Sequence, residues 1–101
     1  MNMVEITMVR VYLTEGHSGV SKVISWFETE ANVRGFTVFR GVEGLGAHGT
    51  VHKASLLDLA AALPIVIEFF DTPERTTEIL EKLRSLVKPD HIVTWSAKSG
   101  S

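Results

Sequence analysis

The stretch "LPIVIEFFD", from Leu63 to Asp71, decides the fold class. It is an apolar run with β-branched and aromatic side chains, which predicts a strand. Successive side chains of a strand point to opposite faces, and here both sets are hydrophobic. One set is Ile65, Ile67 and Phe69, and the other is Val66 and Phe70 on either side of Glu68. A strand of this kind needs cover on both faces of its sheet.

A helix is predicted directly after this strand, in "TPERTTEILEKLRSLVKP" (72–89). Thr72 can cap its N-terminus, and Pro73 suits its first turn. Apolar residues recur at helical spacing along it. The residues expected to form its buried stripe are Ile79, Leu83 and Leu86.

The first part of the chain has the same strand–helix–strand order. "EITMVRVYLT" (5–14) alternates as a strand does, "VSKVISWFETEANVRG" (20–35) has helical spacing, and "FTVFRGV" (36–42) is a second strand. We expect Ser18 to cap this helix and Gly35 to end it.

"HIVTWSA" (91–97) is predicted to be the last strand, and the closing "AKSGS" to be a loose tail. The order is then β-α-β, an irregular insert, and β-α-β. This order predicts an α+β fold, a ferredoxin-like (split βαβ) sandwich with a mainly antiparallel sheet and two helices on one face. Residues 1–101 fit a single domain. Because two helices cover only one face, we expect the other apolar face to meet further copies in a homo-oligomer.

The composition restricts the class of function. The chain has 101 residues, a net charge of -2 and no cysteine. Sequence-independent nucleic-acid binding needs a basic face, and disulfides or thiolate sites need cysteine. The N-terminus carries charges unlike those of a signal peptide, and no apolar run approaches the roughly 20 residues of a membrane helix. We therefore expect a soluble, cytoplasmic protein that does not bind nucleic acid.

The insert begins with "FRGVEGLGAHGTVH" (39–52), which holds four of the eight glycines. Glycine permits positive φ and close approach of a backbone or ligand, and successive N–H groups in such a loop can bind an anion. Arg40 could add a fork of donors for phosphate or carboxylate. The pattern G-x-x-G-x-G is neither the dinucleotide fingerprint nor a phosphate-binding loop. A ligand cradle and a structural bend are both open interpretations.

Two histidines of this insert, His48 and His52, are four residues apart. On a helix that spacing places two metal ligands on one face, but the intervening Gly49 disfavours a helix. Glu43 could complete a divalent-metal site or a carboxylate–histidine pair. No more specific catalytic constellation is present, so we expect the protein not to be an enzyme.

Three stretches together resemble a known family. "VRVYLTE", "FTVFRGVEGLGAHGTVH" and "LPIVIEFFDTPERTTEILEKL" are similar, in order and spacing over roughly residues 5 to 96, to PII-like proteins of the DUF190 family. A more distant similarity is to the nitrogen-regulatory PII proteins, whose T-loop begins Gly-Phe-Gly-Arg-Gln after the second strand. The corresponding residues are Gly44, Leu45, Gly46, Ala47 and His48.

The resemblance implies a homotrimer that binds a small effector, an adenine nucleotide, in clefts between subunits and signals to a protein target. Gly44 and Gly46 match the PII motif, whereas Ala47 replaces its arginine and the arginine-bearing C-terminal segment is missing. AMP, ADP, ATP and cyclic AMP are the candidate ligands, and no cofactor is required. Lys88 is one cation that could replace the missing charges. The expected ligand-binding residues are Arg40, Gly41, Gly44, Gly46, His48 and His52.

The target is an unknown protein. A membrane transporter is one candidate, because some family members occur beside fluoride-exporter genes. Two other interpretations stay open. One is a divalent-metal-binding trimer of CutA type that uses the loop histidines, and the other is a structural or interaction trimer without a ligand.

Overall fold

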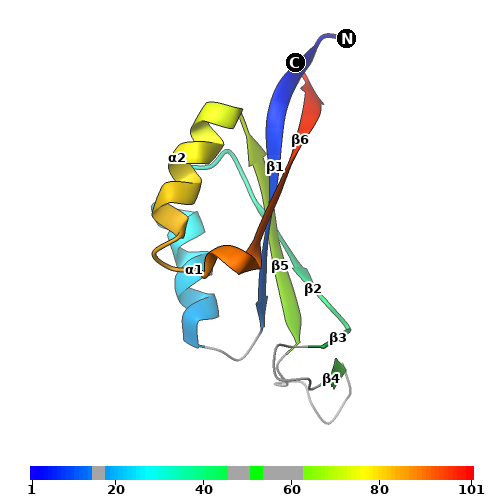
Figure 1. The fold of residues 1–101 in the computed structure, drawn as a ribbon, viewed down its shortest axis with the longest axis vertical. Helices are drawn as coiled ribbons and strands as arrows, with labels where there is room; N and C mark the ends of the chain where they lie inside the picture. The colour runs from blue at the N-terminus through cyan, green and yellow to red at the C-terminus, as the bar shows by residue number, and fades with distance from the viewer. Residues whose placement is uncertain (15–17, 46–50, 54–62) are drawn as a thin grey trace.

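The computed structural model describes residues 1–14, 18–45, 51–53 and 63–101. Four strands form the main sheet: β1 (Met3–Thr14), β2 (Thr37–Arg40), β5 (Pro64–Asp71) and β6 (Ile92–Gly100). Two helices, α1 (Ser18–Thr29) and α2 (Pro73–Leu83), lie together on one side of this sheet (Figure 1). The remaining elements are β3 (Glu43–Leu45), β4 (Val51–Lys53) and the 3-10 turn η1 (Pro89–His91). None of the described helices is both long and apolar enough to cross a bilayer.

The sheet has the strand order β2-β5-β1-β6, and every neighbouring pair is antiparallel. This arrangement confirms the predicted ferredoxin-like α+β sandwich. β5, the most apolar strand, lies between β1 and β2, with Val11 opposite Ile67 and Val38 on its other side. Its side chains on one face are buried by the helices, and those on the other face include Phe70, which is 38% exposed.

The core lies between the sheet and the two helices. Phe27 of α1 occupies its centre, with its ring centroid 5.2 Å from that of Phe69 and 5.5 Å from that of Phe36. Apolar side chains from both layers complete the cluster. They are Val9, Val11, Ile65, Ile67 and Phe69 from the sheet and Val20, Val23, Ala31, Ile79, Leu83 and Val87 from the helical layer.

The start of α2 follows the sequence prediction, but its end does not. The Thr72 hydroxyl oxygen accepts the N–H of Arg75 at 3.2 Å, and Pro73 is the first helical residue. The helix ends at Leu83, so Leu86 falls outside it and is 40% exposed. The prediction that Leu86 belongs to the buried stripe is therefore wrong, and Val87 takes that place in the core.

The predicted boundaries of α1 are also corrected. The helix begins with Ser18 and so includes the residue expected to precede and cap it. It ends at Thr29, and the Trp26 carbonyl accepts the N–H groups of Glu30 and Ala31. The chain turns at Asn32, which has φ 55°, rather than at Gly35. Asparagine is one of the few residues other than glycine that readily adopts this left-handed conformation.

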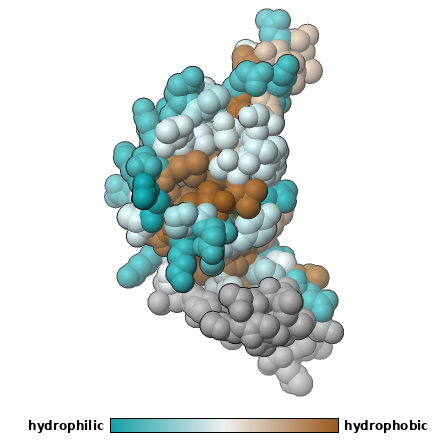
Figure 2. All heavy atoms as spheres, viewed as in Figure 1, coloured by the Kyte–Doolittle hydropathy of each residue, from teal (hydrophilic) through white to brown (hydrophobic). Residues whose placement is uncertain are grey.

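The closing residues are not the expected loose tail. β6 continues to Gly100 and pairs with β1 from Ile6–Ala97 to Met3–Gly100. β5 ends opposite Thr7, so this end of β1 and β6 projects beyond the rest of the sheet as a two-stranded ribbon (Figure 1). Hydrophobic atoms lie exposed at this tip (Figure 2), where Met3 is 51% exposed. The sequence "AKSGS" is weakly strand-forming by itself, and its partner strand supplies the pairing.

Candidate functional site

The face of the sheet away from the helices, here called the open face, carries a continuous set of large apolar side chains. In the strand register, Met8 lies beside Phe70 and Trp95, and Tyr12 lies beside Val66. Five of these side chains keep 38–48% of their surface exposed. They are Tyr12, Phe39, Phe70, Val93 and Trp95. An exposed apolar surface of this extent is typical of a protein–protein interface.

One ion pair lies within the open face. Arg10 and Glu68 are direct partners on β1 and β5, and Arg10 Nε donates to Glu68 Oε2 at 2.7 Å. The Arg10 guanidinium carbon also lies 5.6 Å from the centroid of the Trp95 ring, within the range of a cation–π contact. The hydrogen bond to Glu68 raises the pKa of Arg10 above its ordinary value.

A cavity of about 460 Å³ lies at the border of the open face. One wall is the segment 34–37, which leads into β2, and the other is the end of β5. Thr37 and Glu68, which both line it, are register partners on these adjacent strands. The guanidinium carbon of Arg34 lies 5.4 Å from the centroid of the Phe70 ring. This volume suits a small ligand.

The cavity walls offer a particular set of contacts. The Phe70 ring and the Arg34 guanidinium are flat surfaces on which a planar heterocycle can stack. The Glu68 carboxylate, which gives one oxygen to Arg10, can accept a hydrogen bond from an exocyclic amino group. Sequence reasoning missed these residues because each belongs to an ordinary strand or turn, and only the pairing of β2 with β5 brings them together.

The glycine stretch begins at the other end of β2. The Gly41 N–H donates to the Pro64 carbonyl oxygen at 2.7 Å, which closes the base of the insert. A Cβ added at Gly41 would lie 2.5 Å from Cγ of Pro64, so this close approach requires glycine. These contacts explain Gly41 as a structural residue, and its role in ligand binding stays a prediction.

The structure spreads the other predicted site residues along the insert. Arg40 ends β2 with an exposed side chain, and Gly44 of β3 pairs with His52 of β4. The β3–β4 pair shows that the predicted irregular insert contains regular structure. The remaining two predicted site residues, Gly46 and His48, lie outside the described residues.

These predicted residues lie away from the cavity within one chain. Thr37 pairs with Glu68 at the cavity. Arg40 pairs with Ile65 at the glycine stem, the segment from Arg40 to Gly44 where the insert begins. Thr37 and Arg40 are three residue steps apart in extended chain, a distance of about 10 Å. A single chain therefore presents a cavity and a glycine stem at opposite ends of one short strand.

The histidine hypothesis stays a prediction. His17 and His48 lie outside the described residues, and only the backbone of His52 is described. His91 is engaged elsewhere, with its Nδ1 3.0 Å from the Tyr12 carbonyl oxygen. Among residues 1–14, 18–45, 51–53 and 63–101, no three acidic or histidine side chains gather to hold a metal ion.

The chain is similar to a UPF0166 protein of Aquifex aeolicus, with 28% identity over 88 residues that cover 83% of this chain and 84% of the relative. Its fold is similar to that of CPII, a nitrogen regulatory PII-like protein from Thiomonas intermedia K12 bound to ADP, AMP and bicarbonate. The TM-score is 0.70 at 17% identity, over 99% of this chain and 92% of CPII. The divalent ion tolerance protein CutA1 of Ehrlichia chaffeensis is also similar in fold, with a TM-score of 0.59 at 7% identity over 95% of this chain and 82% of CutA1.

The two structural likenesses show the fold, and the match to a family model shows the family. The model of the DUF190 family, described as "Uncharacterized ACR", matches residues 6–99. This match includes both helices and almost the whole sheet. The chain therefore belongs to the DUF190 family and has a PII-like fold.

Proposed function

We propose that this protein is a non-catalytic, PII-like regulator that binds an adenine nucleotide at the cavity beside the open face. The observation that carries the proposal is the cavity itself, in which Arg34 and Phe70 offer stacking surfaces and Glu68 offers an acceptor. In a pose that places the 6-position at Glu68, adenine donates its amino group, whereas guanine presents a carbonyl oxygen there and has to shift to offer its N1–H or 2-amino group. The bound ADP and AMP of CPII, a protein of the same fold, support this class of ligand.

The protein is proposed to act as a homotrimer whose subunits bury their open faces against one another. Phe39, Val93 and Trp95 are each at least 40% exposed in the single chain, and burial of such side chains is a main source of free energy for association. In this assembly the cavity of one subunit faces the glycine stem of its neighbour. A nucleotide has its base and phosphates at opposite ends, so one molecule can contact both parts.

The glycine stem is proposed to receive the phosphate end of the nucleotide and to report its presence to a protein target. Arg40 and the backbone N–H groups near Gly44 are the candidate contacts, because guanidinium and amide donors both suit phosphate oxygens. A nucleotide that changes the affinity for the target must itself be bound more tightly, by the same factor, when the target is present.

Isothermal titration calorimetry with AMP, ADP, ATP and cyclic AMP tests the proposal, with GDP as the control for the base. We expect at least one adenine nucleotide to bind, and GDP to bind at least tenfold more weakly. In Arg34→Met, we expect the Kd of the adenine nucleotide to rise about tenfold, which equals about 1.4 kcal/mol.

Arg84→Met is the matched control, because Arg84 directly follows α2 and has an exposed side chain that pairs with Glu81 at 3.4 Å. Its nucleotide affinity should equal that of the wild type. The absence of binding heat and thermal shift with all four adenine nucleotides at millimolar concentration would overturn the proposal. A Zn²⁺ titration that gives stoichiometric binding, lost in His52→Ala, would instead support the metal-binding interpretation.

A further inference from the structure

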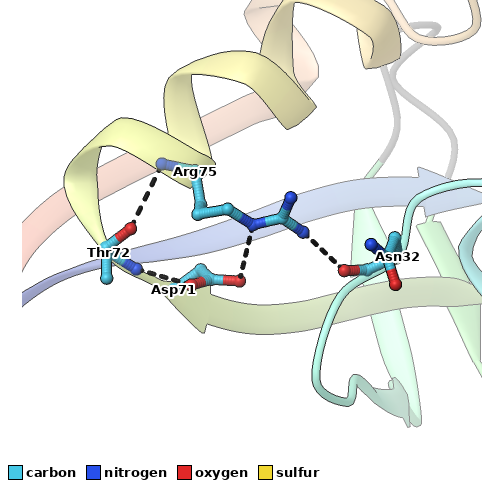
Figure 3. A network of polar contacts seen from close by, with 4 residues as sticks. All are labelled: Asn32, Asp71, Thr72 and Arg75. Atoms are coloured by element: carbon cyan, nitrogen blue, oxygen red, sulfur yellow. Dashed lines mark hydrogen bonds and ion pairs between the residues drawn. The ribbon is translucent and has the colours of Figure 1, made fainter.

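A polar network beside the cavity lies outside the hydrophobic core cluster, and its side-chain contacts are separate from the strand pairing of the sheet (Figure 3). It centres on Arg75 in the first turn of α2. One terminal nitrogen of its guanidinium donates to the Asn32 carbonyl oxygen at 2.6 Å, and Nε lies 3.7 Å from Asp71 Oδ2. A single guanidinium therefore contacts two segments that are 39 positions apart in the sequence, the difference between 71 and 32.

These two segments continue directly into the two walls of the cavity. Asn32 is followed by the segment 34–37, which forms one wall, and Asp71 directly follows Phe70 in the other. A displacement of either anchor moves the corresponding wall. Arg75 itself is absent from the cavity lining, so any effect on a ligand is indirect.

Each anchor is fixed in orientation by its own backbone. The left-handed conformation of Asn32, with φ 55°, turns the chain after α1 and leaves the carbonyl in contact with Arg75 (Figure 3). Asp71 has a side chain only 8% exposed, and its Oδ1 accepts the N–H of Thr72 at 2.8 Å. Thr72 in turn caps α2 by accepting the N–H of Arg75. The helix start, the strand end and the turn after α1 thus share one set of hydrogen bonds.

We propose that Arg75 is a positioning residue, which sets the separation of the two cavity walls and thereby the affinity and base selectivity of the nucleotide site. This inference rests on the proposed function for its ligand. A guanidinium carries its donors on separate nitrogens in a fixed plane, whereas the three donors of a lysine ammonium share one nitrogen, which cannot occupy the positions of both Nε and the terminal nitrogen. Arg75→Lys should therefore keep the attraction to Asp71 and lose the contact with the Asn32 carbonyl.

The first measurement uses no nucleotide. Amide hydrogen exchange is followed in wild type, Arg75→Met and Arg75→Lys, with Arg84→Met, in the turn after α2, as the control. We expect the amides of β2 (37–40) that bond β5 to exchange about tenfold faster in both Arg75 variants, because the wall segment that leads into β2 loses a hydrogen bond to a charged group. Amides in the β1–β5 pairing should be unchanged in every variant. An unchanged rate in β2, or an equal acceleration throughout the sheet, would overturn the proposal.

The second measurement is the Kd for the tightest adenine nucleotide and for GDP. We expect the adenine nucleotide to bind about tenfold more weakly to both Arg75 variants, with a smaller ratio between the two bases, while Arg84→Met keeps the wild-type values. Faster amide exchange with unchanged Kd values would overturn the proposed role of Arg75 in nucleotide binding. If wild type binds no nucleotide, the proposed function fails, and the exchange rates still decide whether Arg75 positions the walls.

Discussion

The two faces of the sheet are built from the same strands but are completed in different ways. On the helix side, Val11 and Ile67 are register partners with no exposed surface. On the open face, the next residues along the same two strands are Tyr12 and Glu68, of which Tyr12 is 42% exposed. Alternation along a strand therefore separates residues that the chain buries by itself from residues that it leaves for another surface.

The single chain buries the helix side of its sheet but leaves the open face exposed. The helix side resembles the interior of any small domain, with hydrophobic contacts and few polar groups. The open face combines large apolar side chains with an ion pair between Arg10 and Glu68, a mixture found in interfaces rather than in cores.

The largest effect is expected on self-association. Phe39→Asp places a carboxylate in the open face opposite the apolar Val66, where burial of an unpaired charge costs several kcal/mol. We expect the Kd for assembly to rise at least 100-fold, which equals about 2.7 kcal/mol, as measured by sedimentation velocity over a range of concentrations. Leu86→Asp is the matched control on the helix layer, since Leu86 is 40% exposed and Phe39 48% exposed. Equal dissociation in both variants would argue against the open face as the interface.

A smaller effect is expected when equivalent side chains on the two faces are shortened. Val11→Ala leaves a cavity in the core and should lower the free energy of unfolding by about 2 kcal/mol. Val93→Ala, measured in the dissociated protein, should lower it by no more than about 0.5 kcal/mol. Urea denaturation of dilute samples gives both values, and similar losses would show that the monomer buries both faces.

The smallest expected effect concerns Thr76, the only described buried side chain with an oxygen that lacks a hydrogen-bond partner. It is 2% exposed and lies among the residues that α2 turns toward the core. Thr76→Val replaces the hydroxyl with a methyl group of similar size, so we expect stabilisation by about 1 kcal/mol in thermal or urea denaturation. Destabilisation would mean that the hydroxyl has a partner, such as a buried water.

The fold was predictable because its signals are local. The hydrophobic run of β5, the cap at Thr72 and the alternation of β1 each depend on neighbouring residues, and all three predictions are confirmed. The helix ends were predicted less well, and the error at the C-terminal strand lies where the partner is remote. The sequence of β6 after Trp95 is weakly strand-forming and is extended only because β1 offers an edge along its whole length.

The cavity was less predictable for a related reason. Arg34, Thr37, Glu68 and Phe70 belong to no motif, and they meet only through the register of β2 and β5. The glycine stretch was predicted to bind a ligand because glycine permits the close approach of a ligand to the backbone. Of its residues, Gly41 proves to serve a close approach of two chain segments, which a sequence pattern cannot distinguish from ligand binding.

That close approach has a consequence for engineering. The hydrogen bond between Gly41 and Pro64 fixes the entry and exit of the insert at one point, so the sheet is held together independently of what lies between them. The entropic cost of a longer loop grows slowly, by about 0.6 kcal/mol for each doubling of length. The insert is therefore a natural position for a fluorescent reporter domain, which would turn the protein into a sensor while its four-stranded frame stays intact.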